Sequence, residues 1–588
     1  MLKKLASHVR QYRRDALLTP VMATGEVLME TLIPFVTASL IDKGINAGSM
    51  PDILKYGLMM LALAMCSLFF GVVCARTAAK ASTGFAANLR SDMYHHIQTF
   101  SFSNIDKFST AGLVTRMTTD VTNVQNAFQM MTRIAVRAPL TLICSMVMCF
   151  VTSHSLSLIF LVALVGLALA LVIIVSMASK RFSAVFQKYD DLNASVQENV
   201  TAIRVVKAFV REDYETEKFN RASENLYRMF VRAEKIVTLN NPVMMATVYI
   251  CILTLSWLGA KQIVAGSLTT GQLTSMFSYV MSVLMSLMML AMIFVMLTMS
   301  IASARRITEV LDEQPDLNNP AAPISVIPNG QVDFDHVTFA YHTGTGEATL
   351  KDIDLHIKSG ETIGIIGGTG CGKSSLVNLI SRLYDVTDGA VRVGGHDVRE
   401  YDMEALRNQV AVVLQKNVLF SGSILENLRW GKADATEQEC REACAAACAD
   451  EFIERLPDGY NTHIEQGGTN VSGGQKQRLC IARALLKHPK VLILDDSTSA
   501  VDTATDARIR RAFATHIPGT TKLIIAQRIA SVQDADRILV LEDGRVAGFA
   551  PHEELMRTNE IYREIYETQT QGGGDFDEAK MSDGGDRA

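Results

Sequence analysis

The chain has 588 residues, and its 56 lysines and arginines against 61 aspartates and glutamates give a formal net charge of −5. Hydrophobic residues make up 48% and charged residues 20%, with a mean hydropathy of +0.18. This composition excludes an intrinsically disordered chain, a collagen-like repeat and a small disulfide scaffold. It also argues against binding of nucleic acid through bulk positive charge.

Apolar stretches of membrane length dominate the first half of the chain. They run over about 16–41, 55–76, 133–153, 156–178, 243–266 and 273–300. A helix that crosses the hydrocarbon core needs about 20 mostly apolar residues, so we expect six spans. The first stretch is weakened by Glu26, Glu30 and Pro34. Arg133 and Arg137 blur the inner boundary of the third.

The gaps between these stretches are alternately short and long. The long gaps, about 77–132 and 179–242, have the pattern of amphipathic helices, for example from Arg204 to Asp213, and would extend the spans far into water. The short gaps after the third and fifth stretches carry almost no charge, whereas the first 14 residues contain five lysines and arginines. The positive-inside rule therefore predicts a multi-pass protein of the inner (plasma) membrane, with both termini and the long gaps in the cytoplasm.

The ten cysteines fit this reducing side of the membrane, and we expect free thiols and no cleaved signal peptide. Cys440, Cys444 and Cys448 follow helical spacing without a histidine, which favours packing residues over a metal site.

Changes in composition predict four parts of the chain. Residues 1–311 would form the transmembrane domain, and the Pro- and Asn-rich residues 312–330 a linker. Residues 331–570 alternate β-rich runs with helical, charged runs, which predicts an α/β domain. The acidic, Gly-rich residues 571–588 are predicted to be a disordered tail without a catalytic role.

A phosphate-binding loop stands in the predicted α/β domain. Residues 362–366 have the pattern of a buried strand, and a helical run begins at Ser375. Between them lies Gly367-Gly368-Thr369-Gly370-Cys371-Gly372-Lys373-Ser374. This is G-x-x-x-x-G-K-S in the context that the P-loop requires, and it predicts binding of ATP with Mg²⁺. Lys373 would reach the β- and γ-phosphates and Ser374 the metal ion, whereas an ordinary Gly-rich turn leaves Lys373 unexplained.

A second buried strand, Val491 to Leu494, ends in Asp495 and Asp496. An acid at the end of such a strand can hold Mg²⁺ in P-loop ATPases, so Asp495 is the second candidate metal ligand.

These residues resemble the ABC transporter family. The stretch Val471-Ser472-Gly473-Gly474-Gln475 resembles the family's signature motif, Gln415 its Q-loop, Asp502 its D-loop and Tyr341 the aromatic residue that stacks on adenine. The resemblance implies a six-helix transmembrane domain with long cytoplasmic helical extensions, followed by an α/β P-loop ATPase domain of ABC type. It also implies that Gln415 joins Ser374 and Asp495 around Mg²⁺.

An exporter-type half-transporter is the form that the resemblance implies. In such machines two chains enclose two ATP molecules, each between the P-loop of one chain and the signature of the other. The bends near 104–112 and 211–216 resemble the coupling helices that carry the motion to the spans.

Two positions depart from the family pattern of an active site. Asp496 stands where the family has the Glu that serves as general base, and Gln527 stands where it has the switch-loop His. Aspartate is one methylene shorter, which moves the carboxylate by about 1 Å, and misplacement of that size can cost about 10²-fold in rate. Glutamine cannot become cationic. We predict a site that binds ATP and hydrolyses it slowly; the alternative is that Asp496 still serves as base.

The signature is nearly intact, so this chain can complete a site on another chain. The pattern resembles the degenerate subunit of heterodimeric bacterial multidrug exporters, which implies a second, different half-transporter as partner. A regulatory subunit that only binds ATP remains an alternative, as does an importer or a lipid or siderophore transporter on the same scaffold.

The spans hint at a lipophilic substrate taken from the bilayer, with lipophilic drugs or lipids as the expected cargo. The sixth stretch places methionines at 281, 285, 288, 292, 296 and 299 on one helix face. Such a face suits a polyspecific cavity, but it also suits packing or lipid contact. Glu26 and Glu30 share a helix face in the first stretch and are candidates for substrate contact or for pairing with another helix.

Overall fold

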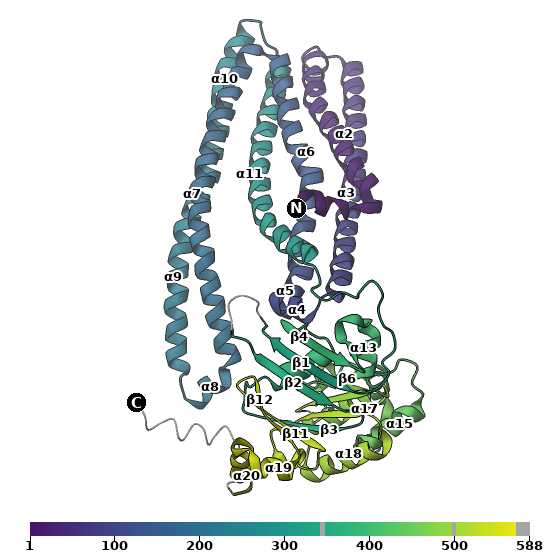
Figure 1. Cartoon of the computed structure of the whole chain (residues 1–588). Helices are drawn as coiled ribbons and strands as arrows, with labels where there is room; N and C mark the ends of the chain where they lie inside the picture. The colour runs from purple at the N-terminus through teal and green to yellow at the C-terminus, as the bar shows by residue number, and fades with distance from the viewer. Residues whose placement is uncertain (342–346, 497–500, 572–588) are drawn as a thin grey trace. The chain divides into compact units, whose positions relative to one another are not determined.

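The computed structural model describes residues 1–341, 347–496 and 501–571, and its chain divides into two compact units (Figure 1). The first unit comprises residues 1–98 and 110–313, and the second comprises residues 99–109 together with the chain from 314 onward. The predicted acidic tail falls almost wholly on residues 572–588, which lie outside the described residues.

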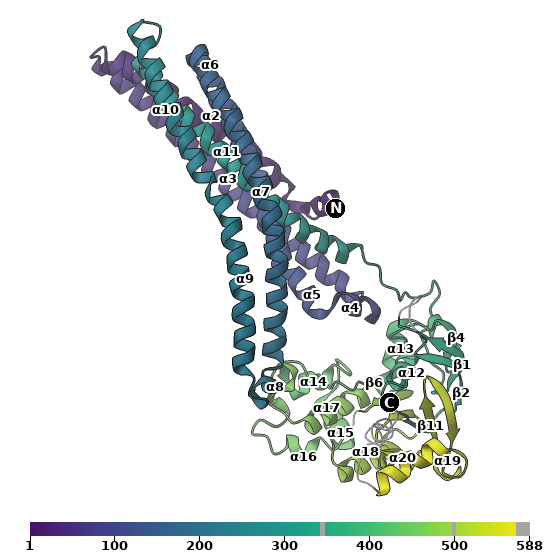
Figure 2. The ribbon, with the colours of Figure 1, turned by 90° about the vertical axis from the view of Figure 1, so that its left-hand side faces the viewer.

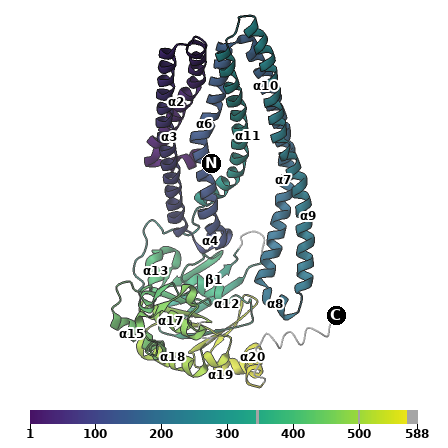
Figure 3. The ribbon, with the colours of Figure 1, turned by 180° about the vertical axis from the view of Figure 1, so that it is seen from behind.

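The first unit is helical. Its helices are α1 (Leu2–Ser7), α2 (Arg13–Ser39), α3 (Met50–Gln98), α5 (Thr110–Thr115), α6 (Val121–Thr152), α7 (His154–Thr201), α8 (Ile203–Ala208), α9 (Glu212–Thr238), α10 (Asn240–Val264) and α11 (Thr270–Asp312). Six helical segments of the described chain are long and apolar enough to cross a membrane, which confirms the predicted six-helix domain. Figures 2 and 3 show α7 running beside α9 and α10 over their whole length.

The reversal between α7 and α9 differs from the sequence expectation. The chain turns over residues 202–211 around the short helix α8, not over 211–216. Glu212, Asp213 and Glu215 instead form the first turn of α9, where carboxylates are stabilised by the positive end of the helix dipole. The run from Arg204 therefore contains a turn and is not one continuous amphipathic helix. Val210, a β-branched residue with φ +51, ends this turn.

Close packing of α2, α3 and α6 depends on small residues. Ala23 of α2 and Ala78, Ala81 and Ala86 of α3 are fully buried. A Cβ at Gly25 would lie 2.8 Å from the ring of Phe70, so any larger residue there would require that ring to shift. Small side chains at such interfaces allow apolar helices to approach and gain dispersion contacts.

The predicted acidic pair of the first span contacts a basic residue of the third. Arg137 of α6 lies 3.0 Å from Glu26 and donates to both carboxylate oxygens of Glu30 at 2.9 Å. The Glu26 side chain is only 8% exposed, and its Oε2 atom accepts no hydrogen bond from the described residues. Pairing between helices, one of the two sequence interpretations, is thus what the structure contains.

The second unit is an α/β domain. A six-stranded sheet has the order β12-β11-β3-β10-β9-β6, and all but its edge strand β12 are parallel. Its strands are β3 (Thr362–Ile366), β6 (Val410–Val413), β9 (Val491–Asp495), β10 (Thr521–Ile525), β11 (Arg537–Glu542) and β12 (Arg545–Ala550). An antiparallel sheet holds β1 (Val332–Phe339), β2 (Leu350–Ile357), β4 (Asp388–Val393) and β5 (His396–Asp397), and β7 (Gly422–Ser423) pairs with β8 (His463–Ile464).

Helices cover the parallel sheet and explain its continuous apolar strands, which are buried on both faces. They are α12 (Lys373–Ile380), α13 (Met403–Gln409), α14 (Ile424–Arg429), α15 (Glu437–Ala446), α16 (Asp450–Ile453), α17 (Gly473–Leu485), α18 (Thr503–His516), α19 (His552–Thr558) and α20 (Glu560–Gln571). Cys440, Cys444 and Cys448 all pack into the core beneath α17, although Cys448 lies beyond the end of α15.

Residues 99–109 join the second unit although they stand between two spans. They contain α4 (Phe102–Phe108), which is capped by Ser101. The Tyr384 hydroxyl donates to Asp106 Oδ2 at 2.8 Å, and Asn104 Nδ2 donates to the carbonyl of Gln314 at 3.1 Å. The first predicted bend is therefore a short helix seated on the α/β domain.

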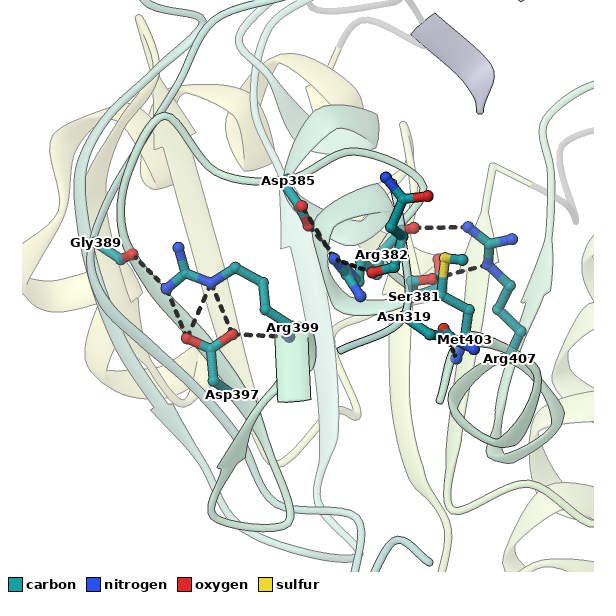
Figure 4. A network of polar contacts seen from close by, with 10 residues as sticks. Asn319, Ser381, Arg382, Asp385, Gly389, Asp397, Arg399, Met403 and Arg407 are labelled. Carbon is teal, nitrogen blue, oxygen red and sulfur yellow. Dashed lines mark hydrogen bonds and ion pairs between the residues drawn. The ribbon is translucent and has the colours of Figure 1, made fainter. Parts of the chain in front are cut away.

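The predicted linker packs along the same domain (Figure 4). Met403 N–H donates to Asn319 Oδ1 at 3.0 Å, and Asn319 Nδ2 donates to Asp402 at 2.6 Å. Arg382 holds Asp385 through two hydrogen bonds of 2.9 and 3.2 Å, and Arg407 donates to the Arg382 carbonyl at 2.8 Å.

Candidate functional site

Three parallel strands bring the predicted catalytic residues to one edge of the sheet. The P-loop follows β3, Asp495 and Asp496 end β9, and Gln527 follows β10. The carboxyl ends of parallel strands in an α/β sheet form the usual ligand crevice. The strand order β3-β10-β9 therefore explains why residues more than 150 positions apart in the sequence meet here.

The P-loop has the backbone that its glycines permit. Gly367 has φ +155, and a Cβ there would lie 2.2 Å from the Leu541 carbonyl oxygen. Gly372 has φ +100 and immediately precedes α12. The ammonium of Lys373 donates to the carbonyls of Gly367 and Gly368 at 2.7 and 2.8 Å. The cation thus lies over the loop, next to the N-terminus of α12, where both attract phosphate.

A hydroxyl and a carboxylate meet beside the P-loop. Ser374 Oγ donates to Asp495 Oδ1 at 3.0 Å, and Asp495 is only 5% exposed. Burial raises the pKa of Asp495, and the hydrogen bond from Ser374 opposes that shift. A serine hydroxyl with one carboxylate is the oxygen set that Mg²⁺ takes together with water and phosphate. These two residues fit the ion that the sequence predicts.

Asp496 is held on two sides by amides. Gln527 Nε2 donates to Asp496 Oδ2 at 2.9 Å, and the side chain of Gln415 also hydrogen-bonds this carboxylate. Asp496 has φ +46, an uncommon conformation for a residue other than glycine. Burial raises its pKa, and the neighbouring charge of Asp495 adds to that effect. The structure therefore brings together both residues that depart from the family pattern.

Aromatic side chains flank the P-loop helix. Tyr341 is 44% exposed, and its hydroxyl lies 2.9 Å from Ser375 Oγ. Its ring meets those of Phe339 and Tyr384 edge to face, with centroids 4.8 and 5.1 Å apart. The exposed ring of Tyr341 is therefore fixed next to the phosphate loop, where an aromatic face can stack on a nucleobase.

The signature residues form an open helix N-terminus. Ser472 caps α17 by accepting from Gln475 N–H at 3.3 Å, and Gln475 Oε1 accepts from Ser472 N–H at 2.8 Å. This capping box leaves the N–H groups of Gly473 and Gly474 at the start of a 13-residue helix. Ser472 and Gly473 are exposed, while Val471 packs partly against the core. The arrangement suits binding of the phosphate of a nucleotide that a second chain holds.

The predicted D-loop residue Asp502 is the N-cap of α18 and accepts from Thr505 N–H at 2.9 Å. Its neighbour Ser499 lies outside the described residues. The remaining loop residues Thr369, Gly370 and Cys371 lie between Gly368 and Gly372, with the Cys371 thiol buried 3.8 Å from the Lys373 ammonium.

A groove of about 310 Å³ opens beside the Gln415 loop. Leu414, Val418, Phe420 and Trp430 line it with apolar surface, and Phe420 and Trp430 stack at 4.1 Å although both are exposed. Lys416, Arg483 and Lys487 add positive charge to its walls. Sequence reasoning missed this groove, because its lining comes from β6, α14 and α17 and no motif joins them.

Comparisons with known proteins agree over most of the chain. A family model described as "ABC transporter transmembrane region" matches residues 17–288, and one described as "ABC transporter" matches residues 350–499. An uncharacterized ABC transporter ATP-binding protein of Bacillus subtilis (strain 168), YfiB, is 36% identical over 97% of this chain and 98% of its own length.

Two further similarities extend this result. An ATP-dependent lipid A-core flippase of Desulfotalea psychrophila (strain LSv54 / DSM 12343) is 31% identical over 82% of this chain and 84% of its own. The solved structure of a bacterial Atm1-family ABC exporter with ATP bound superposes with a TM-score of 0.79 at 23% identity, over 96% of this chain and 99% of that one. The second similarity is one of fold.

Proposed function

This chain belongs to the ABC transporter family, and from that premise we propose that it is one half of a heterodimeric, ATP-driven exporter. Its own P-loop site binds ATP with Mg²⁺ and hydrolyses it slowly. Its signature motif completes the hydrolysing site of a second, different half-transporter. The nucleotide-binding unit lies in the cytoplasm with both termini, and the spans cross the inner membrane.

The contact between Asp496 and Gln527 carries this proposal. A general base must direct a carboxylate oxygen at the attacking water, and the hydrogen bond from Gln527 Nε2 to Asp496 Oδ2 at 2.9 Å competes with that role. The shorter side chain and the second amide from Gln415 restrict it further. The binding residues Tyr341, Lys373 and Ser374 have no such departure. ATP binding with slow hydrolysis follows from this combination.

ATP supplies the phosphates and Mg²⁺ the charge that neutralises them during transfer. Lys373 and the α12 N-terminus would bind the phosphates, Ser374 and Asp495 would hold the metal ion with Gln415, and Tyr341 would stack on the adenine. In the site on the partner's P-loop, Ser472 and the Gly473 and Gly474 amides of this chain would bind the γ-phosphate. Asp502 fixes the start of α18 next to that interface.

We propose that the tip around α8 docks into the partner's counterpart of the groove beside Gln415, and that this groove receives the partner's tip. Phe209 and Val210 are 74% and 81% exposed, and acidic Glu212 and Asp213 follow them. The groove offers apolar Phe420 and Trp430 within basic walls. Lys207 and Arg211 stand beside the two exposed residues of the tip, and Lys207 pairs with Glu212 at 2.9 Å, so the match to the groove rests on apolar surface and not on charge. We assign this contact to the interface between the two chains.

A lipophilic cargo fits the methionine face of α11. Met281, Met285 and Met292 are 43%, 49% and 60% exposed on that face. Flexible, polarizable side chains adapt to varied apolar ligands. The relative named as a lipid A-core flippase favours a lipid over a small drug as the cargo.

ATP turnover of the chain alone, and then with its partner, tests the proposal. We expect negligible turnover alone and robust turnover of the pair. Within the pair, Ser472→Arg should abolish turnover, while Asp496→Asn should leave most of it. Robust turnover of the chain alone that is lost on Asp496→Asn would show that Asp496 is a working base and would overturn the proposal.

Transport direction is tested separately in inside-out vesicles, whose nucleotide-binding units face the bath, with ATP added to the bath. Export predicts uptake of a fluorescent lipophilic probe that depends on ATP and stops in the Ser472→Arg pair. Loss of the probe from preloaded inside-out vesicles would instead indicate import.

A further inference from the structure

The switch loop that carries Gln527 is held by the C-terminal helix through one side chain. Gln569 of α20 accepts from the Ile529 N–H at 2.9 Å and donates from Nε2 to the Gln527 carbonyl at 2.8 Å. Only a primary amide offers a donor and an acceptor side by side in this way. The two backbone partners therefore fix both the position and the orientation of the amide.

We propose that Gln569 is a positioning residue that locks the switch loop, so that the Gln527 amide stays bound to Asp496 and the chain's own site stays slow. The expected effect of Gln569 on hydrolysis rests on the proposed function. The hydrogen bonds from Gln569 to the switch loop do not depend on that function.

The far end of α20 is anchored firmly enough to transmit this constraint. Tyr562 and Ile565 are almost completely buried in the same apolar cluster as Ile529 and Val532. The Tyr562 hydroxyl lies 2.7 Å from His552 Nδ1, and its N–H donates to Asn559 at 2.8 Å. Because the helix is fixed to the core, Gln569 is a fixed point for the loop and not a mobile contact.

The loop itself has little other support at its first residues. Gln527 and Arg528 are exposed, and the short helical turn η7 (Ile529–Ser531) follows at once. The side chain of Gln527 in turn donates from Nε2 to the Asp496 carboxylate at 2.9 Å. Gln569 on α20 is thus hydrogen-bonded to the backbone of Gln527, whose side chain is hydrogen-bonded to Asp496 at the position of the general base. Loss of the hydrogen bonds from Gln569 therefore frees Gln527 from Asp496.

Gln569→Met keeps the length of the side chain and removes both hydrogen bonds, so it is the test variant. The matched control is Glu567→Met, which changes an exposed residue of the same helix. Gln569→Glu is a graded variant, because its carboxylate can still accept from Ile529 N–H but repels the Gln527 carbonyl. All are made in the full chain in lipid nanodiscs.

Hydrogen exchange of the segment 526–533 is the first measurement and needs no activity. We expect exchange to become at least about fivefold faster in Gln569→Met, the change expected from loss of one ordinary hydrogen bond, and intermediate in Gln569→Glu. The control should match the wild type. Unchanged exchange in Gln569→Met would overturn the lock.

Single-turnover hydrolysis by the chain alone is the second measurement, since an assembly of two copies of this chain pairs each slow P-loop with the nearly intact signature of the other copy. We expect Gln569→Met to hydrolyse ATP about threefold to tenfold faster at unchanged ATP affinity, and to lose this gain when combined with Asp496→Asn. Faster exchange with unchanged hydrolysis would overturn the link to Asp496. Rapid turnover in the wild type would refute the slow site while leaving the exchange result valid.

Discussion

Some residues of the nucleotide site lie in sequence motifs that predict their chemistry, and others lie in no motif. Lys373, Ser374 and Asp495 stand in patterns from which their roles are predicted, and the structure places Ser374 in hydrogen-bond contact with Asp495. Gln569 belongs to no pattern, and only the fold brings it to within hydrogen-bond distance of a loop 40 residues earlier. Arg137 looked like a blurred span boundary, because its carboxylate partners lie on another helix.

Removal of Arg137 should destabilise the membrane unit. In Arg137→Ala the buried Glu26 carboxylate loses its ion-pair partner, which costs about 3 kcal/mol when one member of a buried pair is removed. Thermal unfolding in detergent should show a clear drop in melting temperature that Glu26→Gln in the same chain partly restores. Arg221→Ala, which removes an exposed pair with Glu217, is the control and should melt like the wild type. An unchanged melting temperature in Arg137→Ala would contradict the pairing.

The Cys371 thiol should report on nucleotide binding with a defined pH dependence. Burial raises the pKa of this thiol, so little thiolate exists at neutral pH and alkylation is slow. The rate should increase about tenfold per pH unit between pH 7 and 9, and bound ATP should protect. Mass spectrometry of the P-loop peptide measures the rate, and Cys371→Ala is the control for loss of binding. Full alkylation without weaker ATP binding would show that the thiol does not face the nucleotide.

At the level of helices and strands, local chemistry decided which elements the sequence predicted well. The strands 362–366 and 491–494 were readable because parallel strands buried on both faces are continuous apolar runs. The reversal at 202–211 was misplaced because the residues around α8 keep the spacing of an amphipathic helix. The acidic run at Glu212 marks the start of α9, whereas the sequence interpretation places the bend at 211–216.

The contact between α4 and Tyr384 should couple nucleotide binding to the spans. Burial, together with the adjacent Asp106 carboxylate, raises the pKa of Tyr384 well above its ordinary value, so the hydroxyl remains a donor to Asp106. Tyr384→Phe removes only that hydrogen bond. We expect ATP affinity to be retained, while stimulation of turnover by cargo falls severalfold. ATPase assays of the pair with and without a lipid substrate measure this, and full stimulation in Tyr384→Phe would contradict the coupling.

On the scale of the whole molecule, the proposed partner chain accounts for three exposed features. The open N-terminus of α17, the apolar groove beside Gln415 and the bare tip at Phe209 each lie on its surface without a partner among the described residues. Nothing in the sequence pattern predicted the groove, since shape at this scale depends on elements that come together only after folding.

Cysteine cross-linking tests the assignment of the tip to the groove. Phe209→Cys in this chain and a cysteine at the position of the partner's groove that corresponds to Trp430 should form an interchain disulfide under mild oxidation, seen as a band at the summed mass of the two chains on a non-reducing gel. Arg221→Cys, two to three turns farther along α9, replaces Phe209→Cys in the control and should not cross-link. A cross-link confined to a single chain would place the tip differently.

The membership of residues 99–109 in the nucleotide-binding unit has a consequence for how such genes can be recombined. A chimera spliced at the linker would inherit α4 from one parent and Tyr384 from the other, so that two separately evolved surfaces would have to match. A gene fragment that starts at codon 314 would leave Tyr384 uncovered on the side where Phe102 and Asp106 lie against it. The boundary visible in the sequence is thus a poor place to cut, and a faithful exchange would carry the codons for 99–109 along with the distant ATPase half.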